Sequence, residues 1–198
     1  MAKHVTHKPI KQAVLIVALA NFLYFFIEFF GALNIHSVSL FADSIDFLED
    51  SSVNFLIFFA IGWSVASRSR VGMILASFII IPGLTTLWTV YHQITGGQPP
   101  KPTDMSLIGF GALVVNSCCA LLLAKYRHHD ISIIRAAFLS ARNDVAANIA
   151  IILTGMVTAI YPSIWPDVVV GLGIAMMNVD AAKEVYQVAK KEKINAKP

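Results

Sequence analysis

The chain has 198 residues, of which 57% are hydrophobic and only 14% are charged, with a formal net charge of +3. The apolar residues occur in long runs rather than in the amphipathic stripes of a soluble core, which indicates an integral membrane protein. The sequence does not predict nucleic-acid binding, because no basic stripe is interleaved with exposed aromatic residues.

The first apolar run covers residues 12–33 and follows a polar, basic segment at residues 1–11. A membrane-spanning helix needs about 20 apolar residues, so this run can cross a bilayer. No small-residue cleavage site follows it, which favours a permanent helix over a signal peptide. Glu28 falls toward the outer end of the span, and we expect it either to line an exit vestibule or to be a hydrogen-bonded structural acid.

The second run, residues 38–66, contains the acidic stretch "ADSIDFLED". One ionised side chain at the centre of a bilayer costs roughly 2.5–3.5 kcal/mol. Asp46 and Asp50 share one helix face because they are four residues apart, and Asp43 lies one turn before Asp46. Glu49 is rotated by about 100° from Asp50 and is expected to be a vestibule or structural acid. Because two carboxylates one turn apart repel each other, the pattern favours a site for a cation or a proton.

Two alternatives for the acidic stretch remain open at this point. It could be a solvated surface loop, although no Gly or Pro interrupts it before Gly62. It could instead be neutralised by a buried base, for which Arg142 is the candidate, but one arginine cannot pair with four acids.

The third and fourth runs, residues 71–94 and 105–124, are separated by the turn-forming stretch "GGQPPKPTD". Cys118 and Cys119 are adjacent in the fourth run, so they face different sides of a helix and cannot form an ordinary disulfide with each other. We expect them to be small packing residues.

The fifth run, residues 131–160, contains "FLSARNDVAANIAI". Ser140, Asp144 and Asn148 recur at intervals of four and therefore share one helix face, with Asn143 beside them. This helix also offers oxygen ligands. Arg142 is expected to pair with Glu49 or another acid.

The fifth and second runs echo each other, since Asn follows Asp by four residues in both, as Asp50 with Asn54 and Asp144 with Asn148. If the echo is real, the first three and last three helices form an inverted 3+3 repeat. Transporters commonly place their binding site at such a junction near the middle of the membrane.

The sixth run covers residues 163–187, and a short basic tail follows at residues 188–198. Asp180 lies near the inner end of this run, where it is expected to be a vestibule or structural acid. Lys and Arg gather in the two ends of the chain and in alternate loops, which predicts that both ends are cytoplasmic. The sequence thus predicts an all-α membrane protein with one six-helix domain at residues 12–187.

The stretches "SVSLFADSIDFLED" and "FLSARNDV" resemble the cation diffusion facilitator family, whose members bind metal between the second and fifth transmembrane helices. By position, the resemblance implies that Asp46, Asp50, Ser140 and Asp144 are the metal ligands. Serine is a poor zinc ligand compared with imidazole or carboxylate, so an auxiliary oxygen is expected. The candidates for it are Asp43, Asn54, Asn143 and Asn148.

The resemblance further implies efflux of a divalent transition metal in exchange for H⁺. Zn²⁺ is expected first, with Mn²⁺, Fe²⁺, Co²⁺ or Cd²⁺ as alternatives, because an oxygen-rich site also suits harder ions. The chain resembles a short form without the usual cytoplasmic domain, so a homodimer would form through transmembrane helices, in a membrane expected to be the inner cell membrane. The alternatives are a non-transporting subunit or metal sensor and, less favoured, an enzyme like the CDP-alcohol phosphotransferases.

Overall fold

The computed structural model of the chain describes residues 7–60, 65–126 and 132–195, and these residues form six α-helices. The predicted all-α class with six spans is confirmed. The helices are α1 (His7–Ile35), α2 (Val38–Ala60), α3 (Val65–Gly96), α4 (Pro102–Ala124), α5 (Ser132–Ile160) and α6 (Trp165–Asn195).

Local sequence explains most of the helix ends. His36 separates α1 from α2 in a left-handed conformation with φ of 55°, which breaks the helix. Pro102 begins α4 directly after the extended residue Lys101, as expected where a proline's missing N–H costs no hydrogen bond. At the other end of the chain, α6 continues past residue 187 to Asn195, so most of the expected polar tail is helical.

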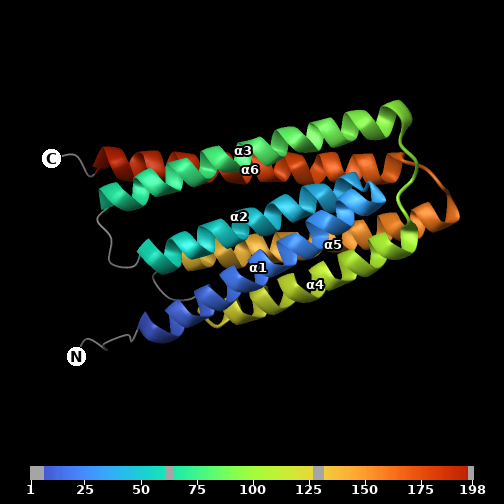
Figure 1. Ribbon diagram of the computed structural model, residues 1–198. Coiled ribbons are helices and arrows are strands. Elements are labelled where there is room, and N and C mark those ends of the chain that lie inside the picture. The colour runs from blue at the N-terminus through green and yellow to red at the C-terminus, as the bar shows by residue number, and fades with distance from the viewer. Residues whose placement is uncertain (1–6, 61–64, 127–131, 196–198) are drawn as a thin grey trace.

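The six helices alternate in direction, and both chain ends lie at the same end of the molecule (Figure 1). Helices α1, α2, α4 and α5 pack together, while α3 and α6 lie side by side along one flank. Helix α6 contacts both α2 and α5. Because α2 and α5 run antiparallel and touch, side chains from the middle of each can meet inside the bundle.

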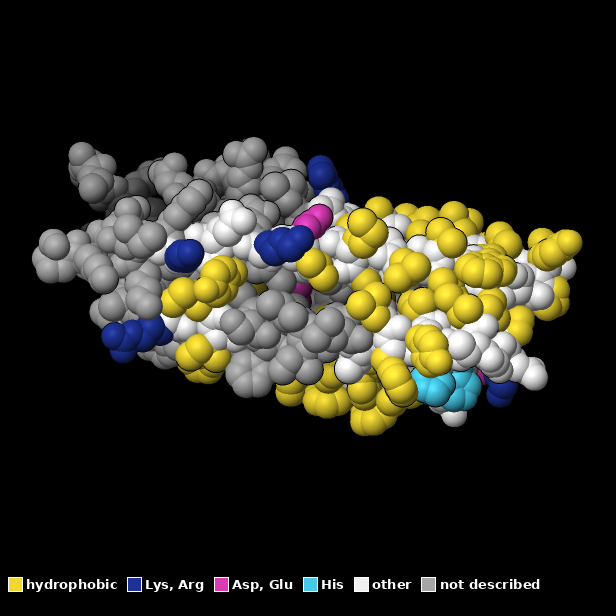
Figure 2. Space-filling model, turned by 90° about the horizontal axis from the view of Figure 1, so that it is seen from above, with side chains coloured by type: hydrophobic (Ala, Val, Ile, Leu, Met, Phe, Trp, Pro, Cys, Tyr) yellow, Lys and Arg dark blue, Asp and Glu magenta, His cyan; other side chains and the backbone are white. Residues whose placement is uncertain are grey.

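Three stretches of the described residues are long and apolar enough to cross a membrane: Pro9–Ile35, Pro102–Ala124 and Ser140–Ile160. Helix α2 is also long enough, since 23 residues span about 34 Å, but it carries four acids. Hydrophobic side chains cover much of the described surface in the half away from the chain ends (Figure 2). Leu23, Ile27 and Leu121 are more than half exposed, which suits contact with lipid.

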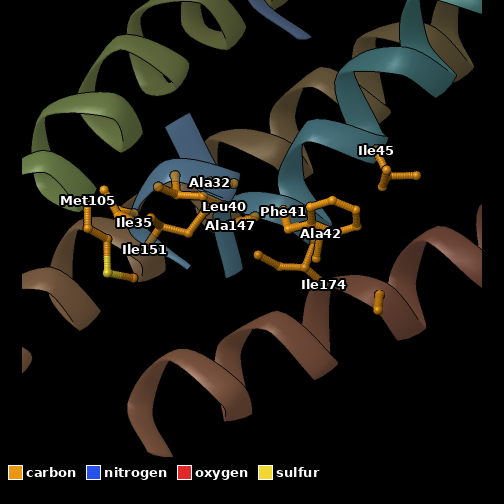
Figure 3. Close-up of a cluster of buried hydrophobic side chains, with 11 residues drawn as sticks. Ala32, Ile35, Leu40, Phe41, Ala42, Ile45, Met105, Ala147, Ile151 and Ile174 are labelled. Carbon is orange, nitrogen blue, oxygen red and sulfur yellow. The ribbon is translucent and has the colours of Figure 1, made fainter. Parts of the chain in front are cut away.

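Two apolar clusters pack the two ends of the bundle. One cluster lies toward the end of the bundle away from the chain termini and is called the outer cluster. It joins α1, α2, α4, α5 and α6 around Leu40, Ile151 and Ile174 (Figure 3). The other cluster, called the inner cluster, lies toward the end that holds the chain termini. It includes Val14, Leu123 and Ala141. The middle of the bundle, between most residues of these clusters, holds several buried acids and asparagines, among them Glu49, Asp144 and Asn148.

Candidate metal site

The polar layer between the apolar clusters is centred on Asp50, which lies near the middle of α2. The Ser140 hydroxyl on α5 donates a hydrogen bond to Asp50 Oδ1 at 3.0 Å. The Asp144 carboxyl, also on α5, lies within hydrogen-bonding reach of Asp50. Helices α2 and α5 therefore bring together three of the four residues that the family resemblance marks as ligands.

Asp46 lies one turn outward of Asp50 on the same helix and is half-buried. Among the carboxylates around Asp46, the charge of Asp144 acts on it most strongly. In the described part of the chain, no three His, Cys, Asp or Glu side chains converge as a preformed ligand group. Asp50, Asp144 and Ser140 are thus the residues of the site that contact one another, and Asp46 lies one turn away on α2.

Asn148 makes two hydrogen bonds that link three helices. Its Oδ1 accepts from Asn116 Nδ2 on α4 at 3.0 Å, and its own Nδ2 donates to Asp43 Oδ2 on α2. Asn148 and Asp43 are fully buried. Both polar atoms of the Asn148 side chain are therefore used in hydrogen bonds that bridge helices. This does not support the expectation that Asn148 is an auxiliary metal ligand.

Asn54 contacts its own helix, because its Nδ2 donates to the backbone oxygen of Asp50 at 2.8 Å. The matching Asp–Asn spacings in α2 and α5 therefore lead to different contacts, local for Asn54 and between helices for Asn148. Asn54 Oδ1 is buried without a hydrogen-bond partner, so its oxygen remains free to receive a donor or a cation.

The expected pairing of Arg142 with Glu49 is wrong. Arg142 and its neighbour Asn143 are exposed, whereas Ala141 before them and Asp144 after them are buried. Glu49 is 5% exposed, and its Oε2 has no hydrogen-bond partner among the described residues. Asn143 is consequently not placed to be an auxiliary ligand, and no described base neutralises the acids of α2.

The remaining predicted acids differ sharply from one another. Glu28 is fully buried, and neither of its oxygens has a hydrogen-bond partner, so the structure contains no open vestibule at this residue. Asp180 is exposed and pairs with Lys183 at 3.1 Å, which is a solvated ion pair at the inner end of α6. The vestibule expectation therefore does not describe Glu28, and Asp180 contacts only its own helix.

Two asparagines that sequence reasoning left out, Asn21 and Asn116, belong to the polar layer, and Asn178 on α6, which could be read as a metal-entry residue or a solvated one, is buried there too. Asn21 on α1 donates to Asp50 Oδ2 at 3.5 Å and lies beside Cys119, whose thiol is 3.8 Å from Asn21 Oδ1. Asn116 supports Asn148, and Asn178 on α6 donates to the backbone oxygen of Ala42 at 3.0 Å. Each is a single amide within an apolar run, and that isolation was the signal available in the sequence.

The charge balance of this layer points to a positively charged ligand. Its buried or half-buried acids are Glu28, Asp43, Asp46, Glu49, Asp50 and Asp144. The one ion pair that joins described residues, Asp180 with Lys183, lies outside this layer. Carboxylates in an apolar interior are stable only when they are protonated, paired or bound to a cation, so the arrangement is suited to exchanging protons for a metal ion.

Residues 14–191 match the family model of the cation efflux transmembrane domain. The match covers both acidic segments and all six helices. A comparison with curated proteins gives no match.

Proposed function

The chain belongs to the cation efflux family, and we propose that it exports Zn²⁺ across the membrane in exchange for protons. Members of this family carry divalent metal cations and are transporters rather than enzymes, so the chain is an integral membrane cation efflux transporter. The enzyme alternative, a CDP-alcohol phosphotransferase, is thereby rejected. The choice of Zn²⁺ and the proton coupling are the parts that need support.

One observation carries the proposal: Asp50 on α2 contacts both Ser140 and Asp144 on α5. Two carboxylates from antiparallel helices meet inside the bundle, where the attraction of a divalent ion is stronger than in bulk water. Asp46 lies one turn away and would supply a third carboxylate. These four residues are the proposed ligands of the exported ion.

The oxygen-only ligand set bears on which metal is carried. Carboxylate and hydroxyl oxygens suit Mn²⁺ and Fe²⁺, whereas Zn²⁺ accepts oxygen, nitrogen and sulfur donors. We place Zn²⁺ first on the resemblance to cation diffusion facilitators, with Mn²⁺, Fe²⁺, Co²⁺ and Cd²⁺ as competitors at the same ligands. Competition among these five ions in one binding assay ranks them.

Proton coupling follows if the metal and protons use the same oxygens. Asp50 and Asp144 release protons when the metal binds from the cytoplasm and take up protons when it leaves on the far side. An alternation between two helix arrangements, each open to one side, would complete the cycle, and the affinity difference between the two states sets its direction. The inner cell membrane and a homodimer formed through transmembrane helices are the proposed setting.

Flux measurements on purified protein in liposomes test the proposal. With an acidic lumen, wild-type protein should accumulate Zn²⁺ and release lumenal protons, and Asp50→Asn should abolish both fluxes. The matched control is Asp104→Asn, which removes a half-buried carboxylate at the outer end of α4, away from the polar layer, and should transport normally. A Zn²⁺ flux that does not change with the imposed pH gradient would contradict proton coupling. Zinc binding without any flux would favour the alternative of a metal sensor or non-transporting subunit.

A further inference from the structure

Glu28 is the least satisfied polar group in the described part of the bundle. It points from α1 toward Asp43 on α2, close enough for the two carboxyl groups to share a hydrogen bond. Both residues are fully buried. No amide, hydroxyl or cationic group of the described residues donates to either Glu28 oxygen or to Asp43 Oδ1.

The orientation of Asp43 is fixed from the opposite side. Asn116 holds Asn148, and Asn148 in turn donates to Asp43 Oδ2. This chain of hydrogen bonds occupies one oxygen of Asp43 and leaves the other without a donor.

Tyr24 lies one turn before Glu28 on α1, and its hydroxyl is held by α4. The hydroxyl donates a hydrogen bond to the backbone oxygen of Ile108 at 2.6 Å. Gly111 leaves room for the hydroxyl, because a Cβ there would lie 2.2 Å from Tyr24 Oη. The oxygens available beside Tyr24 are therefore the carboxylate oxygens of Glu28 and Asp43, which are hard ligands of the type that divalent cations prefer.

The position of the group relates it to the candidate metal site. Helix α2 runs from its outer end at Val38 toward the inside, so Asp43 lies outward of Asp46 by three residues, or about 4.5 Å along the helix axis. An ion that leaves the Asp46–Asp50–Asp144 site toward the outside must travel in this direction. The outer apolar cluster includes Ala42 and Ile45, on either side of Asp43, and extends outward from there to Leu40.

From the unpaired buried oxygens of Glu28 and Asp43, we propose that these two residues form a second binding position for the exported divalent cation, one helical turn outward of the first. The inference rests on the proposed function, because it takes the same ion to visit both positions. The second position holds the ion after it leaves Asp50 and Asp144 and before the outer apolar cluster opens. Water completes its coordination.

Equilibrium dialysis with Zn²⁺ against purified protein in lipid nanodiscs tests this inference. Wild-type protein should bind at least two ions per chain at saturation. Glu28→Gln and Asp50→Asn should each bind one ion fewer than wild type, and the double variant two fewer. The matched control is Asp104→Asn, which removes a half-buried carboxylate of α4 outside the polar layer and should leave the stoichiometry unchanged. Asp43→Asn should repeat the loss seen with Glu28→Gln and replaces that variant if it fails to fold.

The outcomes separate the two proposals. If wild type and Glu28→Gln bind equal numbers of ions while Asp50→Asn loses one, the second position is overturned and the first stands. A pair that only shares a proton gives this same result. If Asp50→Asn binds as wild type does while Glu28→Gln loses an ion, the proposed function fails at its first site and the second position is supported. A wild-type stoichiometry of one ion or fewer overturns the second position without any variant.

Discussion

Single amide side chains hold the polar layer together. Asn148 is the clearest case, since it accepts from Asn116 and donates to Asp43 while being fully buried. Asn21 approaches Asp50 from α1 in a similar way. In a lipid-embedded bundle such bonds fix the rotation of each helix, because an amide that loses its partner cannot turn to water instead.

Replacing Asn148 should therefore destabilise the bundle. Asn148→Ala leaves Asn116 Nδ2 and Asp43 Oδ2 buried without partners, at about 1–3 kcal/mol for each group. Thermal unfolding in detergent should show a midpoint several degrees lower than that of the wild type. Asn143→Ala is the control, because Asn143 is exposed on the same helix. Equal midpoints for the two variants would contradict the bridging role of Asn148.

A substitution at Ser140 should change which metal ion the site prefers. Its hydroxyl contacts Asp50 at 3.0 Å, so a longer side chain here reaches the same ion. Ser140→His replaces a weak oxygen donor with imidazole, which suits Zn²⁺ better than Mn²⁺. We expect the ratio of Zn²⁺ to Mn²⁺ affinity to rise by about tenfold, equivalent to about 1.4 kcal/mol. Competition titration measures this ratio, and an unchanged ratio would show that Ser140 lies outside the coordination sphere.

At the scale of helices, α6 anchors the outer end of α2. Asp167, in the first turn of α6, accepts hydrogen bonds from the backbone N–H groups of Val38 and Ser39 at 2.7 and 3.0 Å. It also accepts from the hydroxyls of Ser37 and Ser39 at 2.8 and 2.6 Å. The carboxylate caps the N-terminus of α2 from another helix, where it also complements the helix dipole. The two helices pack closely here, since a Cβ on Gly171 would lie 2.6 Å from Val38 Cγ1.

Loss of this cap should loosen α2 against α6. Asp167→Ala leaves two backbone donors and two hydroxyls without their acceptor, and we expect a loss of about 2–4 kcal/mol of stability. Asp104→Ala provides the comparison, since Asp104 is also in the first turn of its helix but is only half-buried. Amide hydrogen exchange should rise at the start of α2 in Asp167→Ala alone. Unchanged exchange there would show that α2 is held by packing instead.

The sequence predicted the helices well and the contacts between helices only in part. Long apolar runs are a direct consequence of the bilayer thickness, so the six spans could be predicted within a few residues at most ends. The shared face of Asp46 and Asp50 followed from helix periodicity. Periodicity does not reveal which way a helix is rotated against its neighbours, so the exposure of Arg142 and the bridging by Asn148 could not be foreseen. The burial of Glu28 depends on α1 packing against α2 and was equally inaccessible.

At the scale of the whole molecule, apolar layers above and below enclose the acids. The outer cluster around Leu40 and Ile151 and the inner cluster around Val14 and Leu123 lie on either side of Asp50. Both chain ends lie at the same end of the bundle (Figure 1). In the proposed transport cycle, a cation at Asp50 is therefore enclosed on both sides, and one apolar layer opens at a time.

The orientation of the molecule yields a topology prediction. Lys101 in the α3–α4 link and Lys190 in α6 are both exposed and lie at opposite ends of the bundle. In a background with Cys118 and Cys119 replaced by alanine, a membrane-impermeant maleimide should label Lys101→Cys in intact cells. It should label Lys190→Cys only after lysis, because the chain ends are expected in the cytoplasm. The reverse pattern would invert the direction assigned to transport.

The central claim is that Asp50 and Asp144 hold the exported ion between α2 and α5. Diffraction from crystals grown with Zn²⁺, measured on both sides of the zinc absorption edge, locates the metal directly. The account predicts an anomalous peak within coordinating distance, about 2.0–2.2 Å, of carboxylate oxygens from both Asp50 and Asp144. A well-occupied zinc peak elsewhere on the protein, with none between these two carboxylates, would contradict it.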